Sequence, residues 1–203
     1  MFFIVFLSVH TLANLYMAIR GYQALELTPK YRPWFIAFMV LMFIAYLSGR
    51  SLEKTWYGAI PISLHWIGAF WFVAMLYTTL MILLVDVSRI VNLLIPFIDK
   101  IPVKGYLHLK FYAFIAIASI TALIMIGGHI NAWHPKITEL NLYLPKKAGN
   151  IDSLRIVAAS DIHLGSIIGP RKTAKLVKTI QSLNPDLILF PGDVVDEDVK
   201  PVI

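Results

Sequence analysis

Long apolar stretches occupy most of the first two thirds of the chain. Four of them contain no Asp, Glu, Lys or Arg: residues 1–19, 33–49, 55–85 and 111–135. Crossing the hydrocarbon core of a bilayer takes about 17–25 predominantly apolar residues in a helix, and each stretch is near or above that length. The pattern therefore predicts an α-helical multi-pass membrane region over residues 1–135.

The expected ends of these helices follow from charged, aromatic and proline residues. Arg and Trp residues gather near the borders of the apolar stretches, where transmembrane helices carry their interfacial anchors. Pro61 marks the start of the third helix, because proline fits the first helical turn. No basic segment precedes the first stretch, so a transmembrane helix is favoured there over a cleaved signal peptide. The four helices are expected at about 1–19, 33–49, 61–85 and 111–133.

The loops between these helices bear on orientation. Arg89–Lys104 mixes apolar and charged residues around two prolines, which fits a segment lying on lipid headgroups. Basic residues near helix ends favour the cytoplasmic side. The first and third loops are richer in them, so the soluble part is expected outside the cytoplasm. Those loops hold Arg20, Lys30, Arg32, Arg89, Lys100, Lys104 and Lys110, against Arg50, Lys54, Lys136, Lys146 and Lys147 on the other side.

The hydrophobic pattern changes after the fourth helix. Ile137–Leu144 largely alternates apolar and polar residues and predicts a strand. It lies in a linker region over 136–153. Leu154–Ser160 and Asp186–Phe190 are short apolar runs of the kind that form strands buried in a sheet.

A helix is expected between these two buried strands. It begins at Gly169 and Pro170, and its apolar positions recur at helical spacing. Asn184 and Pro185 end it. A strand, helix and strand of this length make a βαβ unit with two parallel strands. Residues 154–203 are therefore expected to hold the start of an α/β fold.

Acidic and histidine residues follow both predicted strands. Asp161 and His163 come after the first, and Gly192, Asp193 and Asp196 come after the second. Parallel strands end at one sheet edge, where open α/β folds bind ligands. Carboxylate oxygens and an imidazole nitrogen can hold a cation, and one carboxylate can bridge two cations about 3.5–4 Å apart. Gly192 allows a sharp turn before the ligand. The alternative is that the acidic residues cap turns.

The composition agrees with a membrane protein that carries a polar appendage. Of 203 residues, 58% are hydrophobic and 15% are charged, against about 45–50% and 25% in soluble domains. No cysteine is present, which excludes a disulfide scaffold, a thiolate zinc site and a thiol nucleophile. The net charge of +6 comes mainly from loops beside the helices, so it gives no reason to expect a nucleic-acid partner.

Two motifs carry a resemblance to a known family. Residues 160–165, Ser-Asp-Ile-His-Leu-Gly, and residues 184–196, which end in Pro-Gly-Asp-Val-Val-Asp, resemble the opening of a calcineurin-like metallophosphoesterase domain. They are most similar to its membrane-attached bacterial branch. The resemblance implies a two-layer α/β sandwich, of which one βαβ unit is present. It also implies two divalent metal ions, drawn from Mn, Fe and Zn, at the strand ends.

The resemblance also assigns roles to individual residues. It implies that Asp161 and His163 ligate the first metal and that Asp193 bridges both. Asp196 is implied as a partner that orients a ligand. The family's later Gly-Asn-His and Gly-His-x-His segments are absent. Residues 154–203 are therefore expected to be an incomplete phosphoesterase domain in an N-terminal fragment, inactive by itself.

Two functional hypotheses follow. The first is a membrane-anchored, divalent-metal-dependent phosphoric-ester hydrolase in which a metal-activated hydroxide attacks phosphorus. Its partners would be the lipid bilayer and a phosphoester or pyrophosphate substrate, with lipid-linked ones among the candidates. The second is a non-enzymatic multi-pass membrane protein, such as a sensor, scaffold or haem carrier, with a vestigial soluble tail. The histidines available to a haem are His10, His65, His108, His129 and His134.

Overall fold

The chain forms two compact units in the computed structural model. The first is Met1–Asn131 and the second is Ala132–Ile203. The structure describes residues 1–53, 56, 58–96, 105–143, 145, 149, 152–165 and 168–195.

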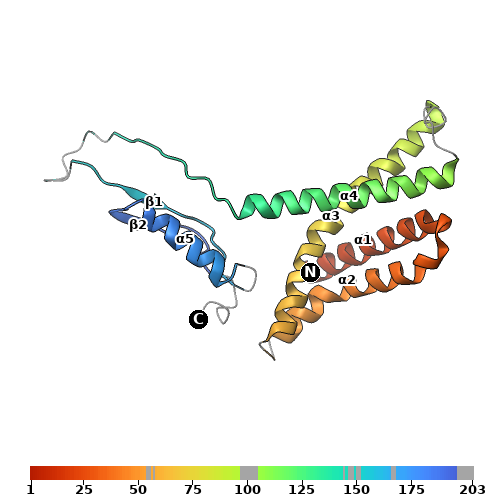
Figure 1. Cartoon of the computed structure of the whole chain (residues 1–203), viewed down its shortest axis with the longest axis horizontal. Helices are drawn as coiled ribbons and strands as arrows, with labels where there is room; N and C mark the ends of the chain where they lie inside the picture. The colour runs from red at the N-terminus through yellow and green to blue at the C-terminus, as the bar shows by residue number, and fades with distance from the viewer. Residues whose placement is uncertain are drawn as a thin grey trace. The chain divides into compact units, whose positions relative to one another are not determined.

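Four long helices make up the first unit (Figure 1). They are α1 (Phe2–Ala24), α2 (Arg32–Glu53), α3 (Ala59–Leu94) and α4 (Tyr106–Ala132). At a rise of 1.5 Å per residue, even α2 is about 33 Å long, which matches the hydrocarbon thickness of a bilayer. All four are long and apolar enough to cross a membrane. The predicted helical membrane region is confirmed as a set of four such helices.

The helices extend beyond the charge-free stretches at most of their ends. Long basic side chains at helix ends can reach the interface while their backbone stays helical, so charged residues do not stop the helix. The largest difference is in α3, which was expected to end near Val85 and continues to Leu94. Arg89 is therefore helical and does not open a separate interfacial segment. Residues 97–104 lie outside the described part of the chain.

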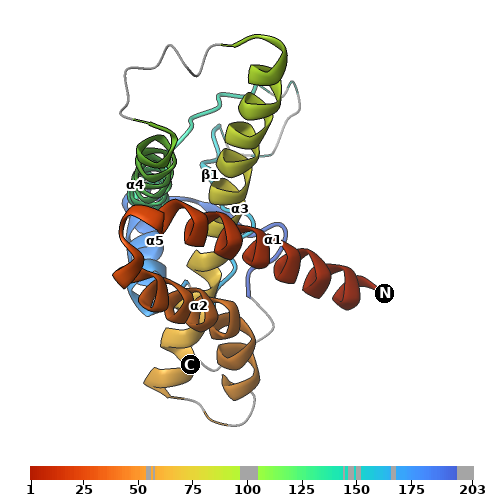
Figure 2. The same cartoon turned by 90° about the vertical axis from the view of Figure 1, so that its right-hand side faces the viewer.

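Two glycines allow α2 and α3 to approach closely, and this pair forms the largest helix interface of the unit. A Cβ atom on Gly68 would lie 2.4 Å from the Cα of Tyr46, and one on Gly49 would lie 2.4 Å from the backbone nitrogen of His65. Small residues at crossings are how transmembrane helices gain packing energy in lipid. Figures 1 and 2 show α1 and α2 running side by side as a hairpin beside α3.

A buried polar cluster links α1, α2 and α3 within the apolar interior. The indole Nε1 of Trp71 donates to Asn14 Oδ1 at 2.9 Å, and the amide nitrogen of Asn14 donates to the carbonyl of His10 at 2.8 Å. His10 Nε2 lies 3.2 Å from the carbonyl oxygen of Phe43 and must donate to it, because a carbonyl only accepts. These hydrogen bonds satisfy groups that hydrocarbon cannot.

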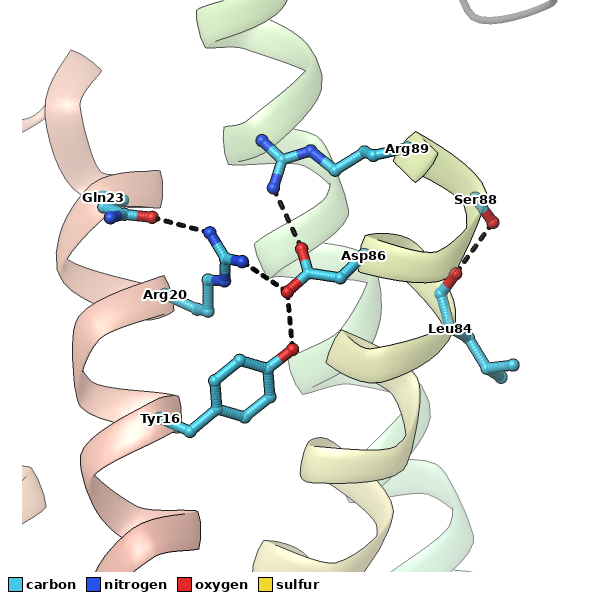
Figure 3. A network of polar contacts seen from close by, with 7 residues as sticks. All are labelled: Tyr16, Arg20, Gln23, Leu84, Asp86, Ser88 and Arg89. Atoms are coloured by element: carbon cyan, nitrogen blue, oxygen red, sulfur yellow. Dashed lines mark hydrogen bonds and ion pairs between the residues drawn. The ribbon is translucent and has the colours of Figure 1, made fainter. Parts of the chain in front are cut away.

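A second polar network joins the end of α1 to the last turns of α3 (Figure 3). Asp86 Oδ2 accepts a hydrogen bond from the Tyr16 hydroxyl at 2.6 Å and pairs with Arg20 at 2.5 Å. Asp86 Oδ1 pairs with Arg89 at 3.0 Å. By sequence, both arginines are expected only as basic residues of the first and third loops. The packing of α1 beside α3 brings both of them to one carboxylate.

The second unit contains the predicted βαβ arrangement. Strands β1 (Ile156–Ala158) and β2 (Leu187–Leu189) pair in parallel, and α5 (Pro170–Ser182) connects them. The register places Val157 beside Ile188. The strands are shorter than the apolar runs that predicted them, although backbone hydrogen bonds continue beyond their ends, from Ala159 N to the Leu189 carbonyl and from Asp186 N to the Arg155 carbonyl. α5 begins at Pro170 as predicted and buries Ile180.

The strand predicted over 137–144 is wrong for its described part. Ile137–Tyr143 has no regular secondary structure, and Leu144 lies outside the described residues. Leu140, Leu142 and Tyr143 are 76%, 75% and 91% exposed. Alternation of apolar residues predicts a strand only where a neighbour can supply backbone hydrogen bonds. Within the described part of this unit, β1 pairs only with β2.

We expect Gly68→Ala to lower the free energy of unfolding by about 1–3 kcal/mol, because the new methyl group meets the α2 backbone. Gly127→Ala in α4 is the matched control, since nothing lies within 4 Å of the added Cβ. It should be neutral or stabilising by up to about 1 kcal/mol through helix propensity. Equilibrium unfolding in detergent micelles measures both, and equal effects of the two substitutions would contradict the close crossing of α2 and α3.

Asn14→Leu should lower the free energy of unfolding by about 1–2 kcal/mol, because the indole N–H of Trp71 loses its acceptor inside the membrane. A double-mutant cycle with Trp71→Phe isolates this hydrogen bond. We expect a coupling energy of about 0.6–1.7 kcal/mol in the same unfolding assay. Strict additivity of the two substitutions would show that the hydrogen bond contributes nothing.

Candidate metal site

The backbone beyond β1 runs beside the backbone beyond β2. His163 N donates to the carbonyl of Asp193 at 3.2 Å, and Leu164 N donates to the carbonyl of Val194 at 3.0 Å. Leu164 also forms a parallel bridge with Val195. These contacts bring the Asp-x-His motif and the Gly-Asp motif to one edge of the strand pair, as the parallel arrangement predicted.

Gly192 lies directly against the carboxylate of Asp161. Its φ of +80° belongs to the left-handed region, which favours glycine. A Cβ atom on Gly192 would lie 2.6 Å from Asp161 Oδ1. Any side chain at this position would therefore push the carboxylate away. The glycine permits both the turn and the approach of Asp161.

Asp161 and His163 also have left-handed backbone conformations, with φ of +50° and +52°. Residues other than glycine adopt this region rarely, although Asn, Asp and His do so more often than most. The tight turn directs the chain from β1 toward the segment that holds Asp193. Such conformations persist where surrounding contacts hold them, and here the hydrogen bonds from His163 N and Leu164 N supply those contacts.

The predicted metal ligands lie at one edge of the strand pair, but their side chains do not converge on a single point. Asp161, His163 and Asp193 are all exposed at the strand ends. Among the residues that the structure describes, no three acidic or histidine side chains lie close enough together to hold a metal ion. Asp196 lies outside the described residues. Two carboxylates and an imidazole nonetheless form a donor set that Mn, Fe and Zn accept.

Asp186, another acidic residue of this unit, forms hydrogen bonds within the strand pair. Asp186 Oδ2 accepts a hydrogen bond from the backbone nitrogen of Arg155 at 2.7 Å, and Asp186 N donates to the Arg155 carbonyl at 2.9 Å. These contacts lie where both strands begin, at the end opposite to Asp161 and Asp193. Asp186 therefore fixes the strand register and is not a candidate ligand.

A cavity of about 1060 Å³ lies between residues 132–141, β1 and α5. Asp161 reaches its lining, whereas His163 and Asp193 do not belong to it. The cavity occupies the side of β1 where Ile137–Tyr143 passes without pairing. The cavity therefore reaches the first motif through Asp161 but does not extend to Asp193.

The histidines considered for haem lie among aromatic rings. His65 meets the ring of Tyr46 edge-on at 5.5 Å, and His129 contacts Phe70 at 5.5 Å. His108 lies 6.4 Å from the Tyr112 ring. His10 is buried within the Asn14 cluster and uses Nε2 for the carbonyl of Phe43.

The sequence that carries the two motifs is similar to a known protein family. Residues 154–202 match the model of the calcineurin-like phosphoesterase family. The match begins just before β1 and includes Asp161, His163, Gly192, Asp193 and Asp196. No solved structure shows a significant match to the chain.

Several curated proteins are similar over part of the chain. The "transmembrane protein with metallophosphoesterase domain" of Danio rerio is 35% identical over 82 residues, which cover 40% of this chain and 19% of that protein. The UDP-2,3-diacylglucosamine pyrophosphatase LpxG of Chlamydia trachomatis is 42% identical over 69 residues, or 34% of this chain and 21% of LpxG. An uncharacterised metallophosphoesterase of Helicobacter pylori is 29% identical over 100 residues, or 49% of this chain and 25% of that protein.

The matched regions thus span about a fifth to a quarter of the length of these relatives. The four apolar helices and the relatives' names support a membrane protein. Through residues 154–202, the chain carries calcineurin-like metallophosphoesterase sequence of the kind found in membrane-associated relatives.

Proposed function

We propose that this chain belongs to a membrane-anchored phosphoric-ester hydrolase that depends on two divalent metal ions. The observation that carries the proposal is the pair of hydrogen bonds from His163 N and Leu164 N to the carbonyls of Asp193 and Val194. Those bonds align the two family motifs at one sheet edge. The family match over the same residues supplies the chemical class.

Each candidate residue has a distinct role in this proposal. Asp161 and His163 would hold the first metal, and Asp193 would bridge both, because a carboxylate offers two oxygens. Asp196 would orient a ligand. Gly192 would keep room for the Asp161 carboxylate, which lies within 2.6 Å of the place where a Cβ would be. When bound, the metals polarise the phosphoryl group and lower the pKa of the attacking water.

Three donors cannot complete two metal sites. Metal ions of this kind take about four to six ligands each, so Asp161, His163 and Asp193 supply too few donors for two sites. By itself the chain would bind a single metal ion weakly and would not turn over substrate.

The substrate class is proposed from anchoring and from the relatives. Membrane helices keep a hydrolase near the bilayer, where lipid-linked phosphoesters and pyrophosphates are available. The name of LpxG, UDP-2,3-diacylglucosamine pyrophosphatase, describes an activity of this class. We extend that class, but not the particular substrate, to the present chain.

The phosphoesterase part would lie outside the cytoplasm. This proposal rests on the excess of basic residues in the first and third loops. Contacts in the first unit support the placement of these two loops on the same side of the membrane. Lys110 pairs with Glu26 at 2.8 Å, and Arg89 lies over the ring of Tyr106. The end of α1, the end of α3 and the start of α4 therefore meet.

Asp193→Asn should strongly weaken the binding of Mn²⁺ to the 203-residue protein. The loss of affinity should exceed the roughly 10–100-fold that is usual when a group only orients a ligand. The substitution keeps the size of the side chain but removes its negative charge. Titration of Mn²⁺ by electron paramagnetic resonance measures the loss, with the melting temperature recorded beside it. Chromogenic phosphoesters should show no turnover with any divalent metal.

Asp152→Asn is the matched control, because Asp152 is exposed, precedes β1 and undergoes the same chemical change. It should leave Mn²⁺ affinity unchanged. If Asp193 only caps a turn, its loss would cost about 0.5–2 kcal/mol of stability and leave metal binding intact. Unchanged Mn²⁺ affinity in folded Asp193→Asn protein would therefore refute the assignment of Asp193 as a ligand. Robust phosphoester turnover by the unsubstituted 203-residue protein would refute the proposal that its metal site is incomplete.

Single-cysteine labelling tests the topology without background, because the chain has no cysteine. Thr138→Cys, beyond α4, should react with an impermeant maleimide in intact cells. Lys30→Cys, between α1 and α2, should react only after the cells are permeabilised. Both positions are exposed. The reverse labelling pattern would place the phosphoesterase part in the cytoplasm.

A further inference from the structure

α4 stands apart from the tightly packed α1–α3 group and reaches it mainly through side chains. The hydroxyls of Thr78 and Thr121 lie 3.3 Å apart near the middle of α4. Toward one end the ring of Phe114 meets Phe35 at 5.8 Å. Toward the other end His129 contacts Phe70. Contacts of this length hold α4 in place but leave space along its inner face.

That space is a cavity of about 930 Å³ within the first unit. Its lining extends along α3 from Ile67 to Arg89, which is about 33 Å of helix. This length is close to the thickness of the hydrocarbon core. The walls are mostly apolar, with side chains such as Met39, Phe114 and Ile117. Apolar side chains that line an empty space have no dispersion contacts on the side that faces it.

One end of the cavity is polar and basic. Arg20, Arg89 and Lys110 line it, and Asp86 is the one carboxylate that the described lining contains. Arg20 lies in the last turns of α1, Arg89 in the last turns of α3, and Lys110 in the first turns of α4. These positions share one level near a membrane interface, where Lys and Arg are found.

The basic end keeps a surplus of positive charge. Asp86 is shared between Arg20 and Arg89, and Lys110 pairs with Glu26, which does not line the cavity. Three cationic groups therefore face two carboxylates, which leaves a charge of +1 (3 − 2). An anionic group arriving at this end would find unused hydrogen-bond donors on the two guanidinium groups.

We propose that this cavity binds one phospholipid with an anionic headgroup. The headgroup phosphate lies by Arg20, Arg89 and Lys110, and an acyl chain follows the inner face of α4. Free phosphate would leave the long apolar part unfilled. A helix from another copy is too large, because about 30 Å of helix with a diameter of about 10 Å occupies roughly 2,400 Å³. A lipid chain matches both the apolar length and the charged end.

Native mass spectrometry of the purified 203-residue protein in detergent tests this. Phosphatidylglycerol and phosphatidylcholine with identical acyl chains are added in equal amounts, and inorganic phosphate is the lipid-free arm. We expect one phosphatidylglycerol bound per protein, at an affinity at least fivefold above that for phosphatidylcholine. Inorganic phosphate should neither bind measurably nor displace the lipid. Equal binding of the two lipids, or phosphate binding as tightly as the lipid, would overturn the proposal.

Charge substitutions locate the headgroup. Arg89→Gln should weaken phosphatidylglycerol binding about fivefold, which is typical of one basic side chain facing anionic lipid. Lys30→Gln removes the same charge near the same helix ends, but Lys30 does not line the cavity. It should change the affinity less than twofold. Equal losses from the two variants would indicate general surface attraction and would reject the cavity as the site.

Size substitutions locate the acyl chain and do not alter charge, so they decide the matter even if Arg89→Gln fails to fold. Ala118→Trp fills the cavity from α4 and should abolish stoichiometric phosphatidylglycerol binding. Ala116→Trp adds the same bulk at an exposed position of α4 outside the lining, and it should bind lipid normally. Normal phosphatidylglycerol binding by the Ala118→Trp protein would overturn the proposal. It would also be overturned if the unsubstituted protein formed a dimer without lipid and Ala118→Trp disrupted that dimer.

Discussion

The parallel pairing of β1 with β2 is the constraint on which the candidate metal site depends. In their register, Ile156 pairs with Leu187 and Ala158 pairs with Leu189. The pairing continues through the hydrogen bond from Ala159 N to Leu189 O. Because the strands run in the same direction, both motifs leave the sheet at one edge. A shift of one residue would separate His163 from Asp193. The Asp186 contact with Arg155, where the strands begin, holds this register.

The first unit follows a different physical logic, because lipid provides no hydrophobic drive for helices to associate. Close packing of α2 on α3 through Gly49 and Gly68 supplies dispersion contacts. Hydrogen bonds around Asn14 and the Asp86 network satisfy polar groups that the bilayer cannot solvate. α4 lacks such a glycine crossing within the described residues. Its looser attachment explains why the large apolar cavity lies along its inner face.

The proposed lipid site and the proposed metal site use separate residues in separate units. The first depends on Arg20, Arg89 and Lys110 at one end of a helix group, and the second depends on Asp161, His163 and Asp193 at a sheet edge. Each can fail while the other stands. If both are correct, the helices do more than anchor the proposed metal site, because they also bind one anionic phospholipid.

Local properties of the sequence determined the class of each part of this protein. Runs of apolar residues predicted four membrane-length helices, and two buried runs followed by acidic motifs predicted the βαβ unit and its ligand edge. Tertiary structure alone decided which helix faces meet, because helices that are apolar on every side carry no stripe that selects a neighbour. Asp86 joining two arginines, Gly68 against Tyr46 and the unpaired segment Ile137–Tyr143 all depend on residues far apart in the chain. The spacing of nearby residues cannot specify such contacts.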